Sequence, residues 1–168
     1  SEELGDKSGI SLAMSNIGMV YNHNKFDFDK ALDYLEKSLK IQEELGDKVM
    51  MGNSLYNIGV VHRNKRDYDK ALDYYGRALA IREELGNKRE MGNILNSIGV
   101  AHANKGDNDK ALEHYSMSLI IREELGDKNR MGQSLYNIGN IHSDKGDYDK
   151  SLDYYKRSHK IFEGLGDK

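Results

Sequence analysis

The sequence predicts an all-α protein, a right-handed solenoid of four helix-turn-helix repeats. Three observations predict this fold. A pattern of about 40 residues recurs four times, and each copy holds two segments whose apolar residues follow the 3.6-residue period of a helix. The chain also contains neither proline nor threonine, a composition that disfavours a β-sandwich or barrel.

The repeats are marked by a short phrase, Gly-Asp-Lys or Gly-Asn-Lys, which recurs at intervals of 41, 40 and 40 residues. It begins at Gly5, Gly46, Gly86 and Gly126. The extra residue of the first repeat lies between Gly18 and Asp29, where we expect a turn. We therefore predict a single domain over residues 1–168, with repeats at about 5–45, 46–85, 86–125 and 126–165.

The second repeat shows the order of elements within one unit. Gly46 suits a left-handed helix end, and Asp47 suits the N-cap of the helix that follows. The apolar period then predicts a first helix from Val49 to about Asn64. After a turn, Asp67 is expected to cap the second helix. Connections of about four residues require consecutive helices to run antiparallel.

Small residues recur within both helices. Gly59, Gly99 and Gly139 lie in the middle of first helices, where glycine costs about 1 kcal/mol relative to alanine. A repeated cost of this kind indicates close contact between helices. Neither helix of a pair can bury its apolar face alone, so neighbouring pairs are expected to stack into a continuous core.

Composition excludes several functions. Twenty-five Lys and Arg oppose 28 Asp and Glu, a net charge of −3, which does not favour nucleic acid or an anionic membrane as partner. The absence of cysteine excludes disulfide and thiolate chemistry. No apolar run approaches the ~18 residues of a membrane span, and no signal peptide opens the chain. We therefore expect a cytoplasmic protein.

The sequence contains no constellation typical of catalysis. His62, His102 and His142 recur at 40-residue spacing, with Tyr21 as their counterpart in the first repeat. One repeat width is too far for a shared metal ion, so we interpret them as packed, hydrogen-bonded core residues. The recurring aspartates lack the glycine and glutamate of a calcium loop and are interpreted as helix caps. We predict no enzyme activity, no cofactor and no metal.

A polar face on the first helices is the best candidate for a binding site. Asparagine is a poor interior helix residue, yet it recurs on this face, where its amide can bond an extended peptide backbone. The predicted contacts are Asn16, Met19, Asn53, Tyr56, Asn57, Val60, Arg63, Asn64, Asn93, Asn96, Val100, Asn104, Gln133, Tyr136, Asn137 and Asn140. Alternatively, Asn16, Asn57 and Asn137 form hydrogen bonds within or between repeats and only shape the solenoid.

The repeats resemble the tetratricopeptide repeat family. Signature small and aromatic residues of that family stand at Gly59, His62 or Tyr21, Tyr68, Ala71, Tyr75 and Ala78. The usual repeat has 34 residues and a proline near its end. These 40-residue, proline-free units look like the extended repeats of kinesin light chains and GoLoco spindle scaffolds, and like those attached to bacterial sensor kinases and cyclases. The resemblance implies an adaptor that binds peptides in a concave groove lined by the first helices.

The best-known pocket of that family, a clamp for C-terminal carboxylates, combines such an asparagine with a Lys or Arg one residue earlier in a neighbouring helix. Here the preceding residues are Ser15, Tyr56, Asn96 and Tyr136, so the basic half of the clamp is missing. Asn57 and Asn137 can be carried over as peptide contacts. The sequence does not favour recognition of a C-terminal acidic motif.

Two functions are compatible with the sequence. The first is a non-enzymatic scaffold that binds a protein or peptide segment. The second is a structural or regulatory arm of a signalling protein that self-associates. Apolar residues crowd the start of the first repeat, among them Ile10, Ile17 and Val20. We expect this apolar end to be a self-association surface, through which two copies of the chain form a two-fold homodimer.

Overall fold

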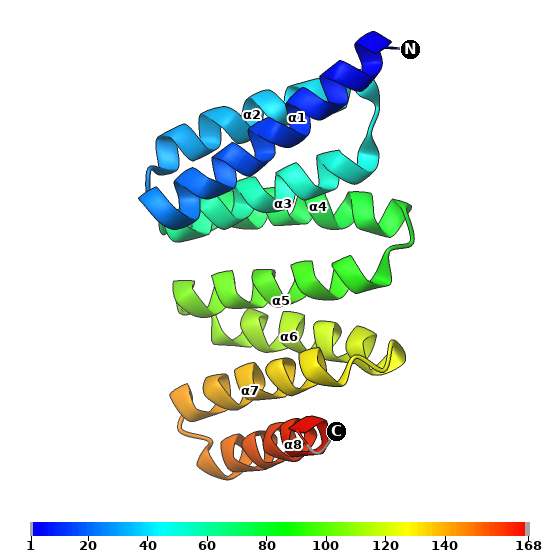
Figure 1. Ribbon diagram of the computed structural model, residues 1–168. Coiled ribbons are helices and arrows are strands. Elements are labelled where there is room, and N and C mark those ends of the chain that lie inside the picture. The colour runs from blue at the N-terminus through cyan, green and yellow to red at the C-terminus, as the bar shows by residue number, and fades with distance from the viewer. Residues whose placement is uncertain (1, 167–168) are drawn as a thin grey trace. The chain divides into compact units, whose positions relative to one another are not determined.

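A computed structural model describes the backbone of residues 2–166 and the side chains of residues 6–166. Eight α-helices and one π-helical turn make up this part of the chain, which contains no strand (Figure 1). The helices are α1 (Glu2–Val20), α2 (Phe28–Leu45), α3 (Lys48–Asn64), α4 (Tyr68–Glu84), α5 (Lys88–Lys105), α6 (Asn108–Glu124), α7 (Lys128–Asp144) and α8 (Tyr148–Gly166). The predicted fold class, an all-α solenoid of four helix pairs, is confirmed.

The chain forms two compact units, residues 1–86 and residues 87–168, with two repeats in each. Within each unit, consecutive helices run antiparallel and pack side by side (Figure 1). In the first unit α2 packs between α1 and α3, and in the second unit α6 packs between α5 and α7. The organisation as one domain remains a prediction.

The helix ends lie where the sequence places them. Gly46 ends α2 with a left-handed φ of 66°, and Asp47 caps α3 by accepting a 3.0 Å bond from the backbone N–H of Met50. Asp67 caps α4 in the same way through the backbone N–H of Lys70. Each cap satisfies a backbone donor that the helix leaves free, which fixes the starting residue.

The first repeat departs from this pattern at both ends of its first helix. α1 begins at Glu2, so the first Gly-Asp-Lys phrase lies inside a helix instead of at a helix boundary. The extra residue is accommodated by the π-helical turn Tyr21–Lys25, whose wider ring takes one more residue per turn. Phe26 then adopts a left-handed φ of 51° before Asp27 caps α2.

The mid-helix glycines hold tyrosine rings from the second helices. The pairs are Gly59 with Tyr75, Gly99 with Tyr115 and Gly139 with Tyr155. A Cβ atom at Gly59 would lie 2.7 Å from two ring carbons of Tyr75, closer than carbon atoms can pack. The predicted reason for these glycines, close helix contact, is confirmed.

Alanines of the second helices complete the core. Ala31, Ala71, Ala78 and Ala111 are fully buried, as the stacking of helix pairs requires. Leu85, which follows these helical positions in the second repeat, is 41% exposed. It forms the C-cap of α4 and lies beyond the last helical turn that packs on α3.

Candidate functional site

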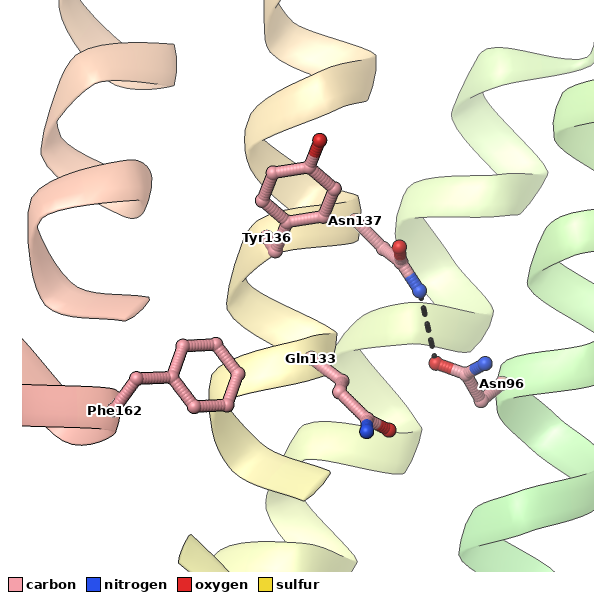
Figure 2. A pocket seen from close by; sticks show the side chains of 5 residues that line it. All are labelled: Asn96, Gln133, Tyr136, Asn137 and Phe162. Carbon is pink, nitrogen blue, oxygen red and sulfur yellow. Dashed lines mark hydrogen bonds between the residues drawn. The ribbon is translucent and has the colours of Figure 1, made fainter. Parts of the chain in front are cut away.

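The predicted polar face of the first helices contains a small hollow in each unit. In the second unit the hollow measures about 270 Å³ and lies between α5, α7 and α8. Its lining residues are Asn96, Gln133, Tyr136, Asn137 and Phe162 (Figure 2). Phe162 reaches from α8 toward α7, and Tyr136 is 52% exposed. The hollow therefore combines apolar rings with three amide groups.

The hollow of the first unit measures about 190 Å³ and lies between α1 and α3. It is lined by Leu12, Ser15, Asn16, Met50, Asn53, Tyr56 and Asn57. Asn53, Tyr56 and Asn57 occupy the repeat positions that Gln133, Tyr136 and Asn137 occupy in the second unit. The two units thus present the same three first-helix positions to a hollow.

Several of the predicted amides bond to other side chains. Asn137 Nδ2 donates to Asn96 Oδ1 across 3.2 Å, which joins α7 to α5 (Figure 2). Asn64 Nδ2 donates to the buried Asn22 at 3.0 Å, and the Tyr155 hydroxyl donates to Asn140 at 2.7 Å. The alternative that some asparagines link repeats is therefore confirmed for Asn137, which also lines the second hollow.

The remaining predicted contacts differ in how much surface they offer. Asn16, Asn53, Asn64, Asn104, Gln133 and Tyr136 are exposed, and Met19, Tyr56, Asn57, Arg63, Asn93, Asn96, Val100, Asn137 and Asn140 are half-buried. Val60 is only 6% exposed, so it offers little surface to a ligand. Val100 also packs against the core of the second unit.

Two buried arginines lie beneath the hollows, and the sequence analysis missed both. Arg82 of α4 donates to the side-chain oxygen of Asn53, while Arg122 of α6 donates to Asn96 Oδ1 at 3.4 Å. Arg82 is 3% exposed and Arg122 is 4% exposed. Burial and, to a smaller extent, the charge of nearby Arg130 together lower the pKa of Arg122 to about 10. A comparison of the repeats could have pointed to these arginines. The residue that follows Ile81 or Ile121 is an arginine, but the equivalent position holds Gln42 in the first repeat and Phe162 in the fourth.

The recurring histidines are packed against rings, as predicted. The predicted hydrogen bonding is wrong for His62 and His102, because the Nδ1 atom of each is buried without a hydrogen-bond partner in the described part of the chain. His62 stacks on Tyr74 with ring centroids 5.4 Å apart, and His102 stacks on His114 at 5.3 Å. Tyr21 stacks on Tyr34 at the equivalent place in the first repeat. Burial lowers the pKa of both His62 and His102, which favours the neutral rings.

Residues 6–166 contain no group of three or more His, Cys, Asp or Glu side chains that could hold a metal ion. None of the described helices combines the length and apolar character needed to cross a bilayer. The two amide-lined hollows are the places where several of the predicted contact residues meet at the surface.

The repeated helix pairs, with a hollow on the first helices of each unit, place the chain in the class of α-helical repeat proteins. Proteins of this class generally serve binding and not catalysis. The sequence matches the tetratricopeptide repeat family over residues 9–84 and 90–164, and the chain belongs to that family. No curated protein matches the sequence. Membership in this family supports a role as a protein–protein interaction scaffold.

Solved structures with the same fold come from several proteins. BtubC (BKLC) from P. vanneervenii is 23% identical, with a TM-score of 0.85 over 93% of this chain and 64% of that protein. Aspartyl phosphate phosphatase F from Bacillus subtilis is 17% identical, with a TM-score of 0.89 over 96% of this chain and 42% of its own. A Rap protein complexed with competence and sporulation factor is 19% identical, with a TM-score of 0.80 over 95% and 43% of the two chains. The chain thus spans between two fifths and two thirds of these proteins.

Proposed function

We propose that the chain is a non-enzymatic scaffold that binds a peptide segment of another protein along its first helices. The observation that carries this proposal is the repetition of one lining in both units. Asn53, Tyr56 and Asn57 line the hollow of the first unit, and the equivalent Gln133, Tyr136 and Asn137 line the second. Each set offers amides for a peptide backbone beside an aromatic ring for an apolar side chain.

The fold comparison supports this proposal. A Rap protein of the same fold has been solved in complex with competence and sporulation factor. In this chain the hollows are open and small. Hollows of this kind can hold single side chains of an extended segment, whereas a compact small molecule is usually enclosed by a larger pocket. The bound segment would contact the first helices, while the second helices support them from behind.

The proposal is tested by selecting binders from a displayed library of random 16-residue peptides and measuring their affinity by fluorescence anisotropy. Truncation of a hydrogen-bonding anchor typically costs ~1–3 kcal/mol, so Asn57→Ala combined with Asn137→Ala should weaken a selected peptide at least tenfold. Asn24→Ala combined with Asn108→Ala removes two amides outside the hollows and should leave affinity unchanged. The proposal would be refuted if the chain selected no peptide from the library, or if the two double variants bound the selected peptide with equal affinity.

A second function, self-association through the first repeat, is favoured by the exposure of α1. Ile17 is 40% exposed and Val20 is 47% exposed, whereas their counterparts in α3, Ile58 and Val61, are fully buried. We propose that two copies cover this face in a two-fold dimer. Sedimentation across a wide concentration range tests it. A monomer at all concentrations would contradict it, and Ile17→Glu should abolish any dimer that forms.

A further inference from the structure

Each unit contains one contact in which the second helix of a repeat packs on the first helix of the next repeat. α2 packs on α3 in the first unit, and α6 packs on α7 in the second. Both contacts join equivalent positions of equivalent helices, so they show which residues of a first helix and of a second helix meet there. α1 and α8 carry matching residues on faces that are exposed.

The contact between α6 and α7 is mainly apolar. Tyr115 and Leu119 of α6 share one buried cluster with Ile138 and Ile141 of α7, and Leu112 of α6 packs against this cluster. The four cluster residues are at most 9% exposed. Burial of apolar side chains between neighbouring repeats is what holds a repeat protein together.

An ion pair recurs at one end of both contacts. Lys65, the C-cap of α3, donates to Asp29 of α2 at 2.7 Å. Lys145, the C-cap of α7, donates to Asp109 of α6 at 2.6 Å. An exposed ion pair contributes little free energy, but it determines which ends of the two helices lie together.

α1 presents the first-helix side of this contact to solvent. Ile17 and Val20 occupy the positions that Ile138 and Ile141 occupy in α7, and both are exposed. Lys25 occupies the position of the ion-pairing lysine of α7. Its ammonium lies over a tyrosine ring and pairs with no carboxylate among residues 6–166. The apolar residues and the cation of the contact are therefore both available on the first repeat.

α8 presents the second-helix side of the same contact. Leu152 is 51% exposed, whereas its counterpart in α6 is half-buried. Asp149 stands at the position of the ion-pairing aspartate of α6 and forms no ion pair in the described part of the chain. A hollow of about 620 Å³ on this helix is lined by Tyr136, Tyr155, Ser158, His159 and Phe162. Tyr155 and His159 occupy the positions through which α6 packs on α7, so the hollow marks the place of a first helix.

From these matching faces we infer that α1 of one copy of the chain packs on α8 of a second copy, as α7 packs on α6. Ile17 and Val20 then cover the hollow of α8 and the exposed Leu152. Lys25 of one copy pairs with Asp149 of the other. This inference rests on the self-association through the first repeat that is proposed above, and it identifies the surface of the second copy that α1 meets.

Two observations favour α8 over a second α1 as the surface that α1 meets. Within each unit, the extensive contact of a first helix with a neighbouring repeat is made with a second helix. α8 also offers an unpaired aspartate at the position where that contact places an ion pair. In a two-fold dimer the contact between α1 and α8 forms twice, because the residue pairs of such an interface are reciprocal.

Two variants, each of which disrupts one side of the contact, test the inference. Ile17→Glu places a charge on the face of α1, and Leu152→Glu places one on the face of α8. A carboxylate buried in an apolar contact should weaken self-association of either variant by roughly a hundredfold. Sedimentation velocity is then measured on an equimolar mixture in which one variant carries a fluorescent label. The intact α1 of one variant can meet the intact α8 of the other, so the mixture should form a labelled heterodimer.

Ile120→Glu is the matched control for these substitutions. Ile120 is an exposed isoleucine of α6, and lysine occupies its position in the first and fourth repeats, so this variant should self-associate like the unmodified chain. A charge exchange tests the alignment of the helices. Lys25→Glu and Asp149→Lys should each weaken self-association about fivefold, and the two together should restore it. Circular dichroism checks that each variant folds.

The outcomes separate the inference from the proposed self-association. Two monomeric single variants whose mixture associates support the inference. If Leu152→Glu associates as tightly as the unmodified chain, or if the mixture remains monomeric, the inference is overturned while self-association through α1 stands. Failure of the charge exchange to restore association refutes the predicted pairing of Lys25 with Asp149. A chain that is monomeric at all concentrations removes both self-association and the inference.

Discussion

The contact between Gly59 and the Tyr75 ring provides a direct test of how the helix pairs are held together. An ideal Cβ at Gly59 would lie 2.7 Å from ring atoms Cδ1 and Cε1 of Tyr75 and 3.3 Å from the backbone oxygen of Ala71. Tyr75 is fully buried, so its ring has no free space into which it can move. Gly59→Ala therefore forces either the ring or the two helices apart.

The expected magnitude follows from two opposing effects. Overpacking of a buried site costs about 1–3 kcal/mol, while alanine gains about 1 kcal/mol over glycine in a helix. The net result for Gly59→Ala is a loss of about 1 kcal/mol. Gly76 is the matched control, because it lies in α4 with no atom within 4 Å of its ideal Cβ. Gly76→Ala should gain about 1 kcal/mol from helix propensity alone.

Urea unfolding followed by circular dichroism measures both variants, and melting temperatures should move by ~2–4 °C per kcal/mol in opposite directions. Tyr75→Leu provides a second test. In that background the ring is gone, so Gly59→Ala should become stabilising, and the double-mutant cycle should show strong coupling. If Gly59→Ala stabilises the unmodified chain as much as Gly76→Ala does, the steric account of the recurring glycines is wrong.

Two further predictions concern pH and the first turn. Because burial holds the pKa of His62 and His102 below the unfolded value of about 6.5, the unfolded chain binds protons first as the pH falls. The free energy of unfolding should therefore be greatest above pH 6.5 and decrease between pH 7 and pH 5, and His62→Tyr combined with His102→Tyr should flatten this profile in urea titrations. Phe26, 72% exposed at a φ of 51°, occupies the position of Gly106 and Gly146. Phe26→Gly should stabilise the chain by about 0.5–1 kcal/mol in the same assay, and a loss of stability would contradict the strained-turn account.

The helix boundaries could be predicted because their causes are local. A glycine with left-handed φ followed by an aspartate is sufficient to end one helix and cap the next, as Gly46 and Asp47 do. The first repeat was predicted less well. The extra residue could be placed in a turn from the count alone, but its accommodation as a π-helical turn ending at Phe26 depends on packing between α1 and α2.

It could also be predicted that the side of the first helices that carries most of the asparagines lies away from the core, since helical phase separates the two sides. The pairing of its amides could not. Asn96 and Asn137 are 41 residues apart, and their bond depends on the distance between α5 and α7 within the second unit. Sequence periodicity fixes which residues share a face, whereas the spacing of helices is set by the side chains packed between them.

The buried arginines escaped prediction because an Arg-Glu-Glu segment is typical of a solvated helix face. The structure gives the physical reason for the burial of Arg82. Gly52 of α3 leaves space above Arg82, since a Cβ there would lie 3.0 Å from the guanidinium carbon. Without that space the guanidinium could not lie flat against α3 and reach Asn53. The cause is therefore a glycine thirty residues away, which no local pattern around Arg82 reveals.

The same space allows different side chains of the second helices to occupy one repeat position beside the two hollows. In the fourth repeat Phe162 fills it, and a Cβ at Gly132 would lie 2.7 Å from the phenyl ring. A long side chain of the second helix thus lies across a glycine of the first helix in both cases. Where the side chain is Arg82, the hollow above it lies close to positive charge. Where it is Phe162, the ring itself becomes a wall of the hollow. The backbone scaffold remains constant while a single exchange converts a charge behind the lining into an apolar surface, so the hollows of the two units differ in chemistry although their first-helix positions are the same.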